Sequence, residues 1–241
     1  MEAVTCRCGR LAIAFAIVVL FVGPPIRASA DPGAAVFPGV EIRQGGSLCM
    51  VGFVEPRLRV AMTSGQCGSG DSAVTDHQGN PVGTVVLARR QAPEDAAANG
   101  AMLPVEYEVI ALGPAVTASD VLPTGRQLRS SPGQRAQPGL PVCQFRRAAG
   151  QQCGSINSVS NGRFTVAGVA VDSRDFGGPV YALTDDGGAV IVGLFEGIWG
   201  SAPEMESWQA VMQQVYLDGR AHNQQQIPQG ELRMIGRRAA A

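Results

Sequence analysis

The chain has 241 residues and a formal net charge of −1, and 45% of its residues are hydrophobic while 16% are charged. Because the charges nearly cancel, the composition gives no electrostatic reason to expect nucleic acid or an anionic membrane surface as a partner. The length suffices for one large β domain or for two small domains.

The N-terminus has the pattern of a secretory signal peptide. Arg7 and Arg10 precede an apolar run of 13 residues, 11–23, and the sequence Ala-Ser-Ala that ends at Ala30 follows it. This order predicts that residues 1–30 are a signal peptide cleaved after Ala30, and that the mature protein is secreted or extracytoplasmic. A bilayer span takes about 20 apolar residues, so we expect no stable membrane insertion after cleavage. An uncleaved anchor is the alternative.

Short apolar segments bounded by turn residues recur along the mature chain. Examples are "SLCMVGFV", "VEYEVIAL", "RFTVAGVAV" and "GAVIVGLF". This pattern is typical of an all-β barrel or sandwich. Asn161-Gly162 lies between two such segments and predicts a two-residue hairpin turn, because both residues accept positive φ.

One segment near the C-terminus predicts a helix. The sequence from Ser201 to Glu204 can form a capping box, with Pro203 in the first turn. Apolar residues at helical spacing follow it, and they are Trp208, Val211, Met212, Val215 and Tyr216. Gly219 is a natural stop. We therefore expect a helix over 201–219 that docks on the β core through packing residues such as Trp208, and a polar tail over 220–241.

The mature chain holds an even number of cysteines: Cys49, Cys67, Cys143 and Cys153. In a secreted chain an even count favours disulfides, and four cysteines allow three pairings. Nearness in sequence favours Cys49 with Cys67 and Cys143 with Cys153. Gaps of 17 and 9 residues do not fit the closely spaced ligands of a zinc site. We expect no metal and no cofactor.

Three separated stretches resemble one known family. They are "LCMVGFV" leading into "AMTSGQCG", then "VCQFRRAAGQQCG", and finally "RDFGGPVY". They resemble the chymotrypsin-fold (trypsin-like) serine proteases, above all the secreted bacterial branch typified by streptogrisins and α-lytic protease. The resemblance implies two six-stranded antiparallel β-barrels, at 31–120 and 121–200, followed by the C-terminal helix. It also supports the two disulfide pairings favoured above.

The family's chemistry uses a serine nucleophile, a histidine base and an aspartate that orients the histidine. The resemblance places Gln66 at the histidine position, where an amide cannot act as a base near neutral pH. It places Glu106 at the aspartate position, with Glu108 two residues further on and facing the same side. Phe176 falls at the nucleophile position and has neither hydroxyl nor thiol. The resemblance therefore implies a degenerate triad and no catalytic residues.

The other expected site residues surround the cleft between the barrels. Arg174 replaces a glycine and would crowd the pocket in which backbone N–H groups stabilise an oxyanion. The remaining candidates for the cleft are Asp175, Gly177, Phe195, Glu196 and Trp199. An extended strand of the cleft wall pairs with peptide backbone in this family, so a peptide or a secreted protein is the expected partner.

An unorthodox serine endopeptidase that uses Ser173 is the alternative function. Neither of the two histidines provides an obvious base for it, because His77 lies in a turn-like stretch and His222 follows the expected helix. Serine–lysine chemistry is excluded, because the chain contains no lysine. A secreted structural protein unrelated to proteases is a third interpretation.

Overall fold

A computed structural model describes residues 33–68, 73–90, 105–170, 172–200 and 202–226 of the chain. The expected signal peptide and the end of the polar tail lie outside these residues, so both remain predictions. Within the described part, no helix has the length and apolar character needed to cross a membrane.

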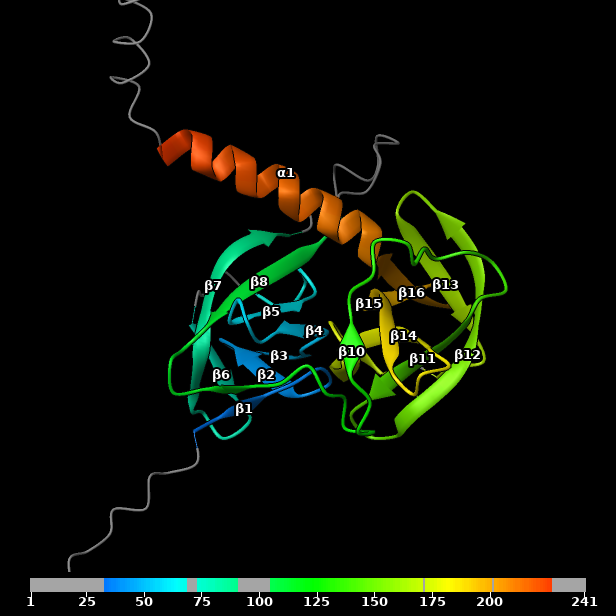
Figure 1. Ribbon diagram of the computed structural model, residues 1–241, viewed down its shortest axis with the longest axis horizontal. Helices are drawn as coiled ribbons and strands as arrows, with labels where there is room; N and C mark the ends of the chain where they lie inside the picture. The colour runs from blue at the N-terminus through cyan, green and yellow to red at the C-terminus, as the bar shows by residue number, and fades with distance from the viewer. Residues whose placement is uncertain (1–32, 69–72, 91–104, 171, 201, 227–241) are drawn as a thin grey trace, which may run out of the picture. The chain divides into compact units, whose positions relative to one another are not determined.

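The first sheet belongs to the N-terminal half and curls into a half-barrel (Figure 1). Its seven strands pair in the order β3-β2-β6-β7-β8-β5-β4, and all neighbours are antiparallel. The strands are β2 (Glu41–Gln44), β3 (Ser47–Met50), β4 (Phe53–Glu55), β5 (Val60–Thr63), β6 (Ala73–Asp76), β7 (Pro81–Arg89) and β8 (Tyr107–Leu112). Among the described residues β3 and β4 remain the two edges, so hydrogen bonds do not close this barrel.

The second sheet closes into a six-stranded barrel, because β15 pairs with β16 as well as with β14. A seventh strand, β10, extends the sheet beside β15 in parallel. The strands are β10 (Leu128–Arg129), β11 (Pro141–Arg146), β12 (Gly150–Ser160), β13 (Arg163–Ala167), β14 (Pro179–Leu183), β15 (Ala189–Trp199) and β16 (Ala202–Ser207). A short parallel pair joins β1 (Ala35–Val36) to β9 (Thr117–Ala118). The prediction of a trypsin-like all-β fold is confirmed.

Each sheet surrounds its own apolar core, since alternate side chains of a strand point to one face. Ile42, Val54 and Ile110 are fully buried in the first core, and Val180, Phe195 and Met205 in part of the second. The half-buried ring of Phe176 packs against both of these clusters. This residue therefore lies where the two halves of the protein meet.

Two local predictions are confirmed by the backbone and the sulfur atoms. Asn161 and Gly162 connect β12 to β13 with φ values of 51° and 80°, as a tight hairpin requires. Cys49 is bonded to Cys67, and Cys143 to Cys153.

The helix prediction is wrong at both ends. Residues 202–207 form β16, because pairing with β13 and β15 overrides the local capping signal. The helix α1 spans Trp208–Gln226, and the Ser207 hydroxyl caps it by accepting a hydrogen bond of 3.2 Å from the Ala210 N–H. Gly219 does not end it. The preceding residue, Asp218, anchors this part of α1 by accepting hydrogen bonds from Arg89 and from the Tyr107 hydroxyl at 2.7 Å.

Trp208 packs in the interior of the protein, as expected. Its ring centroid lies 4.8 Å from that of Phe53, its exposed fraction is 3%, and its indole N–H donates to the Ser130 hydroxyl at 2.7 Å. The start of α1 is thereby fixed to β4 of the first sheet and to the segment that joins the two sheets.

Candidate functional site

The loop after β5 brings Gln66 against Glu106. Gln66 is exposed, and the neighbouring Cys67 is fixed by its disulfide. Glu106 directly precedes β8 and is fully buried. A Cβ on Gly65 would lie 2.1 Å from the Arg89 carbonyl oxygen and 3.0 Å from Glu106 Cβ, so only glycine permits this close approach. The two residues that the resemblance aligns with histidine and aspartate are therefore neighbours.

Burial raises the pKa of Glu106. The positive charge of Arg163, and hydrogen bonds from the Gln66 and Arg163 side chains, act in the opposite direction. An amide that donates to a buried carboxyl group holds that group in place but transfers no proton itself. The contact between Gln66 and Glu106 thus holds the two side chains next to each other, but it supplies no general base.

Phe176 follows a single 3-10 turn, η2 (Ser173–Asp175), and its ring stacks on Phe195. The ring centroids are 5.6 Å apart and the planes are inclined by 15°. The next residue, Gly177, has a φ of +78°, and a Cβ there would lie 2.0 Å from Thr63 Oγ1. Its N–H donates to the Phe195 carbonyl at 2.8 Å. Glycine is required here, and the turn fixes the Phe176 ring at the seam between the sheets.

The backbone N–H of Arg174 already has a strong acceptor. It donates to Asp172 Oδ1 at 3.0 Å, and the guanidinium Nε donates to the same oxygen at 3.0 Å. The hydrogen bonds from Arg174 hold the pKa of the Asp172 carboxyl below its usual range. A cavity of about 190 Å³ adjoins this pair and is lined also by Arg147, Ala148 and Asp175. One backbone N–H of the loop that the resemblance implies for oxyanion stabilisation is thus already bonded to an anion of the chain itself.

Asp175 contributes to the lining of this cavity, but its side chain is held in a buried ion pair. It is 1% exposed, and its carboxylate accepts from Arg146 Nε at 2.7 Å and from the Arg147 N–H at 3.0 Å. Both oxygens are satisfied in a buried ion pair that joins η2 to the end of β11. Asp175 therefore stabilises the loop rather than presenting a group to a ligand.

Glu196 is the expected site residue with the most unusual surroundings. It is 1% exposed, and it accepts a hydrogen bond of 2.6 Å from the hydroxyl of Ser64. Burial raises its pKa well above the usual value, and the nearby carboxyl groups of Glu206 and Glu106 act in the same direction. Ser64 itself is fully buried, so this pair is closed to a substrate.

Two further residues complete this group and were missed from the sequence. Arg163 on β13 donates to Glu206 Oε1 at 2.8 Å and lies 3.4 Å from Glu106 Oε1. Burial raises the pKa of Glu206 to about 7, against the effect of the Arg163 charge. Glu206 was overlooked because residues 202–207 were expected to be helical. In a strand its side chain faces the barrel seam, directly opposite Arg163 in the register.

We call Glu106, Glu196, Glu206, Arg163 and Ser64 the seam cluster. Three of its contacts cross between the sheets: Ser64 to Glu196, Arg163 to Glu106, and the Glu106 N–H to the Glu206 carboxyl group. Each of the three buried carboxyl groups keeps one oxygen without a hydrogen-bond partner. Raised pKa values are consistent with this arrangement, because a protonated carboxyl avoids the cost of a buried charge.

The remaining candidates are not brought together. His77 lies exposed between β6 and β7, and His222 lies exposed in the last part of α1. Glu108 is buried and pairs with Arg90 and Gln44. The side chain of Trp199 lies outside the described residues. Within the described part, no group of three or more histidine, cysteine or acidic residues is arranged to hold a metal ion.

The fold is that of the chymotrypsin-like serine proteases. Protease A of Thermobifida fusca superposes with a TM-score of 0.56 at 22% identity, covering 77% of this chain and 97% of that one. A chymotrypsin from Cellulomonas bogoriensis superposes with a TM-score of 0.56 at 19% identity, covering 75% of this chain and 95% of that one. An inactivated protease paralogue of the scabies mite, S-I1, superposes with a TM-score of 0.52 at 12% identity, covering 73% of this chain and 92% of that one.

The sequence itself identifies a closer group. The uncharacterized protein Rv1815 of Mycobacterium tuberculosis strain H37Rv is 42% identical over 209 residues, which are 86% of this chain and 94% of that protein. The chain belongs to the family of Rv1815. No protein-family model matches it.

Proposed function

We propose that this protein is a catalytically inactive chymotrypsin-fold homologue that binds an extended peptide, or an extended segment of a secreted protein, between its two sheets. The observation that carries the proposal is the Phe176 ring, which stacks on Phe195 and which the resemblance aligns with the nucleophile. The resemblance likewise aligns Gln66 with the histidine and Glu106 with the aspartate. Nucleophile and base act as a unit, so losing both removes most of their effect on the rate.

The surroundings of Phe176 support this proposal. The Arg174 N–H is hydrogen-bonded to Asp172, so no free pair of donors faces a developing oxyanion. One structural neighbour, the scabies mite paralogue, is an inactivated protease. Inactive members of this fold therefore occur.

The binding part of the proposal rests on the end of β15. Its pairing with β14 stops at Leu194, whereas its pairing with β16 continues to Trp199. From Gly197 to Trp199 the strand therefore has one side without a described strand neighbour. An unpaired strand edge can take up an extended peptide through backbone hydrogen bonds.

Ser173 gains no support as a nucleophile. It lies exposed in η2, and among the described residues its hydroxyl has no hydrogen-bonded base. The Ser64 hydroxyl has a carboxyl partner but is buried. We therefore retain one functional proposal.

Panning a library of extended peptides against the mature protein tests it. We expect bound peptides to be recovered intact by mass spectrometry, and hydrogen exchange to slow at Gly197–Trp199. Ile198→Arg changes a side chain 58% exposed on this edge and should weaken binding about tenfold, a loss of ~1.4 kcal/mol. Leu183→Arg is the matched control, because the Leu183 side chain on β14 is 45% exposed, and it should leave peptide binding unchanged. Cleaved peptides, or equal effects of both variants, would contradict the proposal.

A further inference from the structure

The two disulfides of the protein differ in their exposure. The bond between Cys49 and Cys67 is buried, and these residues are 3% and 1% exposed. In the other bond Cys143 is 4% exposed and packs in an apolar cluster, whereas Cys153 on β12 is exposed. A disulfide is exchanged by attack of a thiolate on one of its sulfur atoms, so access to that atom controls the rate. Cys153 is therefore the one of these four cysteines that a thiolate from solvent can reach.

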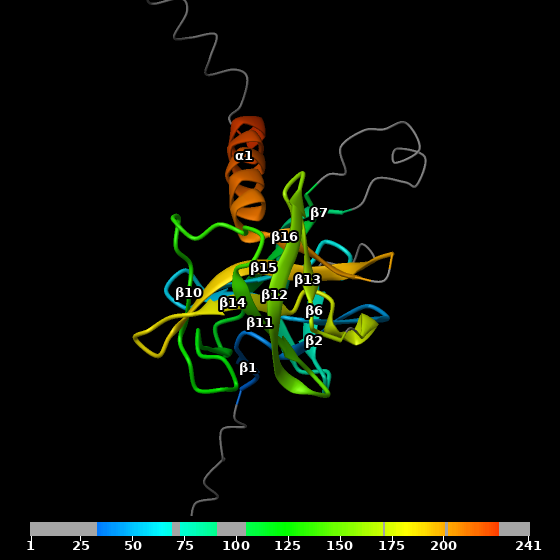
Figure 2. The same cartoon turned by 90° about the vertical axis from the view of Figure 1, so that its right-hand side faces the viewer.

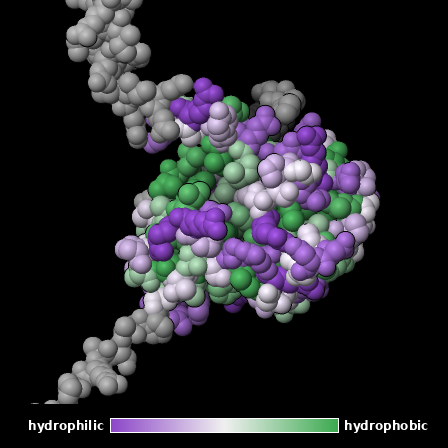
Figure 3. Space-filling model, in the orientation of Figure 1, coloured by the Kyte–Doolittle hydropathy of each residue, from purple (hydrophilic) through white to green (hydrophobic). Residues whose placement is uncertain are grey.

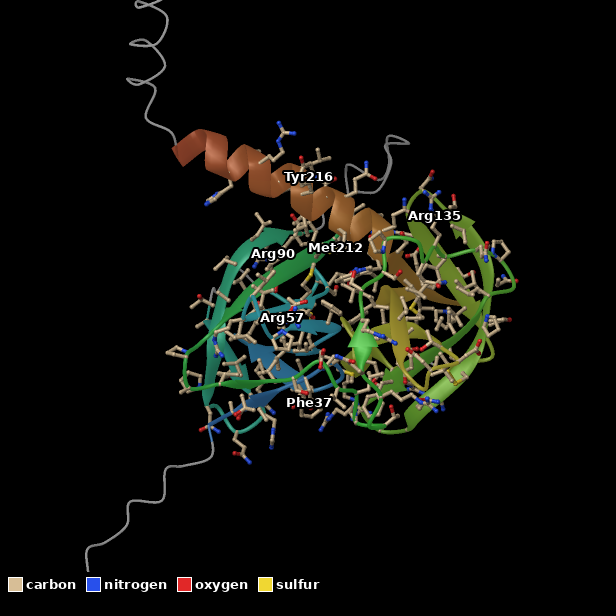
Figure 4. The ribbon with its side chains drawn as sticks, in the orientation of Figure 1. Phe37, Arg57, Arg90, Arg135, Met212 and Tyr216 are labelled. Carbon is tan, nitrogen blue, oxygen red and sulfur yellow. A yellow bond between two sulfur atoms is a disulfide. The ribbon has the colours of Figure 1, made fainter. Side chains whose placement is uncertain are left out.

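Cys143 and Cys153 lie directly opposite each other on the antiparallel strands β11 and β12. Figure 2 shows these strands side by side on the side of the second sheet that faces the viewer. In Figure 4, Arg57 marks the first sheet, and β12 runs along the opposite edge of the molecule. The neighbours of Cys153 on the same face of β12, Gln151 and Ser155, are exposed and polar. Hydrophilic side chains also gather on the half of Figure 3 that covers the second sheet, and such a surface suits a small, soluble thiol.

Beyond this bond the hairpin of β11 and β12 is two-stranded in the part of the chain that the structure describes. β11 pairs with β14 only at Cys143 and Gln144, and β12 pairs with β13 only from Ser155 onward. Residues 145–151, which we call the hairpin end, thus have no described strand neighbour outside the hairpin. A two-stranded hairpin is only marginally stable on its own. The disulfide at its base therefore contributes to the order of the hairpin end.

The hairpin end in turn holds the loop that carries Phe176. Arg146 Nε donates to the carboxylate of Asp175 at 2.7 Å, and the Arg147 N–H donates to the same carboxylate at 3.0 Å. The Arg147 guanidinium also pairs with Glu41 of the first sheet. Phe176 directly follows Asp175 in the chain. A change in the order of the hairpin end is therefore transmitted to the Phe176 loop.

We propose that the bond between Cys143 and Cys153 is a redox switch: a low-molecular-mass thiol reduces it, and reduction loosens the hairpin end and the Phe176 loop while the protein stays folded. The backbone pairing of β11 with β12 spans six residue pairs and does not require the sulfur atoms, so the second sheet persists after reduction. The proposal does not depend on peptide binding at β15.

The exchange takes two steps. The thiolate of the reductant attacks Sγ of Cys153, forms a mixed disulfide there, and displaces Cys143 as a thiolate that takes up a proton. A second molecule of the thiol, as its thiolate, then attacks the reductant's sulfur in the mixed disulfide. This step releases the Cys153 thiolate and the disulfide of the reductant, so two thiols supply the two electrons that the protein disulfide accepts.

Glutathione buffers of increasing reducing strength test the chemistry on the unaltered mature protein. Free thiols are trapped with iodoacetamide and mapped by mass spectrometry. We expect Cys143 and Cys153 to be alkylated at a glutathione concentration at least about tenfold below that needed for Cys49 and Cys67, and glutathione to be trapped on Cys153. Equal reduction of the two bonds, or glutathione mapped to Cys143, would overturn the proposal.

Hydrogen exchange in the reducing buffer tests the coupling. We expect exchange to accelerate at least about fivefold at the hairpin end and at 173–177, and to stay unchanged at β8 (Tyr107–Leu112). A Cys143→Ala, Cys153→Ala protein is the matched control, because it should show the accelerated pattern without reductant and no further response to glutathione. Unchanged exchange at 173–177 after reduction of the unaltered protein would overturn the switch. Acceleration throughout the chain would overturn it too, because the bond would then be needed for the fold itself.

Discussion

The Arg163 guanidinium of the second sheet lies 3.4 Å from the carboxyl group of Glu106 in the first sheet, and it also pairs with Glu206 at 2.8 Å and Glu204 at 3.3 Å. The Arg163 side chain is 11% exposed, and the carboxyl groups of Glu106 and Glu206 are fully buried. One cation therefore compensates several buried acids at the seam. Stability at this place depends on how many of those acids are ionised.

Removing the cation should be costly. Arg163→Met leaves Glu106 and Glu206 without their positive partner, and loss of one member of a buried ion pair costs about 3–5 kcal/mol. The free energy of unfolding from urea titration measures the change. Arg135→Met, at an exposed position, should change it by less than about 0.5 kcal/mol. Similar values for the two variants would contradict the role of the seam cluster.

Stability should fall as the pH rises. Glutamate ordinarily has a pKa of 4.5, and burial raises that of Glu206 to about 7. Because the folded value is the higher one, this group favours the folded state most below pH 4.5, and that contribution is lost as the pH rises to about 7. One such group contributes up to about 3 kcal/mol to the free energy of unfolding. Glu206→Gln removes a titrating group, so its free energy of unfolding should depend less steeply on pH between 4.5 and 7 than that of the unaltered protein. Equal slopes would be inconsistent with this account.

The turn after Phe176 should not tolerate a side chain. Gly177→Ala combines a φ of +78° with a Cβ only 2.0 Å from Thr63 Oγ1. Gly187→Ala has a φ of +82° but open space around its Cβ, so it isolates the backbone cost of about 1–2 kcal/mol. We expect a distinctly lower melting temperature for Gly177→Ala than for Gly187→Ala. Equal melting temperatures would show that the loop is looser than described.

Introducing a histidine and a serine at the aligned triad positions should not give the reactivity of an active serine protease. A Gln66→His, Phe176→Ser protein gains a base and a hydroxyl, but Asp172 still occupies the Arg174 N–H. Loss of one oxyanion donor lowers rates about 10²–10³-fold, so labelling by a fluorophosphonate should remain slow. Adding Asp172→Ala frees the Arg174 N–H and should accelerate the labelling. No difference between the double and triple variants would argue against the blocked donor.

The all-β architecture could be predicted from the sequence, because it is encoded by local signals. These signals are the short apolar segments, the Asn161-Gly162 turn and the spacing of the cysteines. The pairing of Cys49 with Cys67 followed from nearness and from the resemblance, and the structure confirms it. The resemblance also located Gln66, Glu106 and Phe176 in separate segments, and the structure places Gln66 against Glu106, with Phe176 at the seam of the two sheets.

The seam cluster could not be predicted in the same way. Arg163, Glu106 and Glu206 are brought together by pairing of β13 with β16 and by contact between the two sheets, and neither has a local signature. The capping signal at Ser201–Glu204 even favoured the wrong element. The ion pair of Asp175 could not be predicted either, because its partner, Arg146, lies 29 residues away in the sequence.

The most direct test of the central claim is fluorophosphonate labelling of the unaltered mature protein, with an active serine protease as the positive control. The account predicts no labelling, because Phe176 offers no nucleophile and Ser173 has no hydrogen-bonded base among the described residues. Labelling that maps to Ser173 or Ser64 would contradict it, and would show that the protein is a serine hydrolase with an unorthodox site.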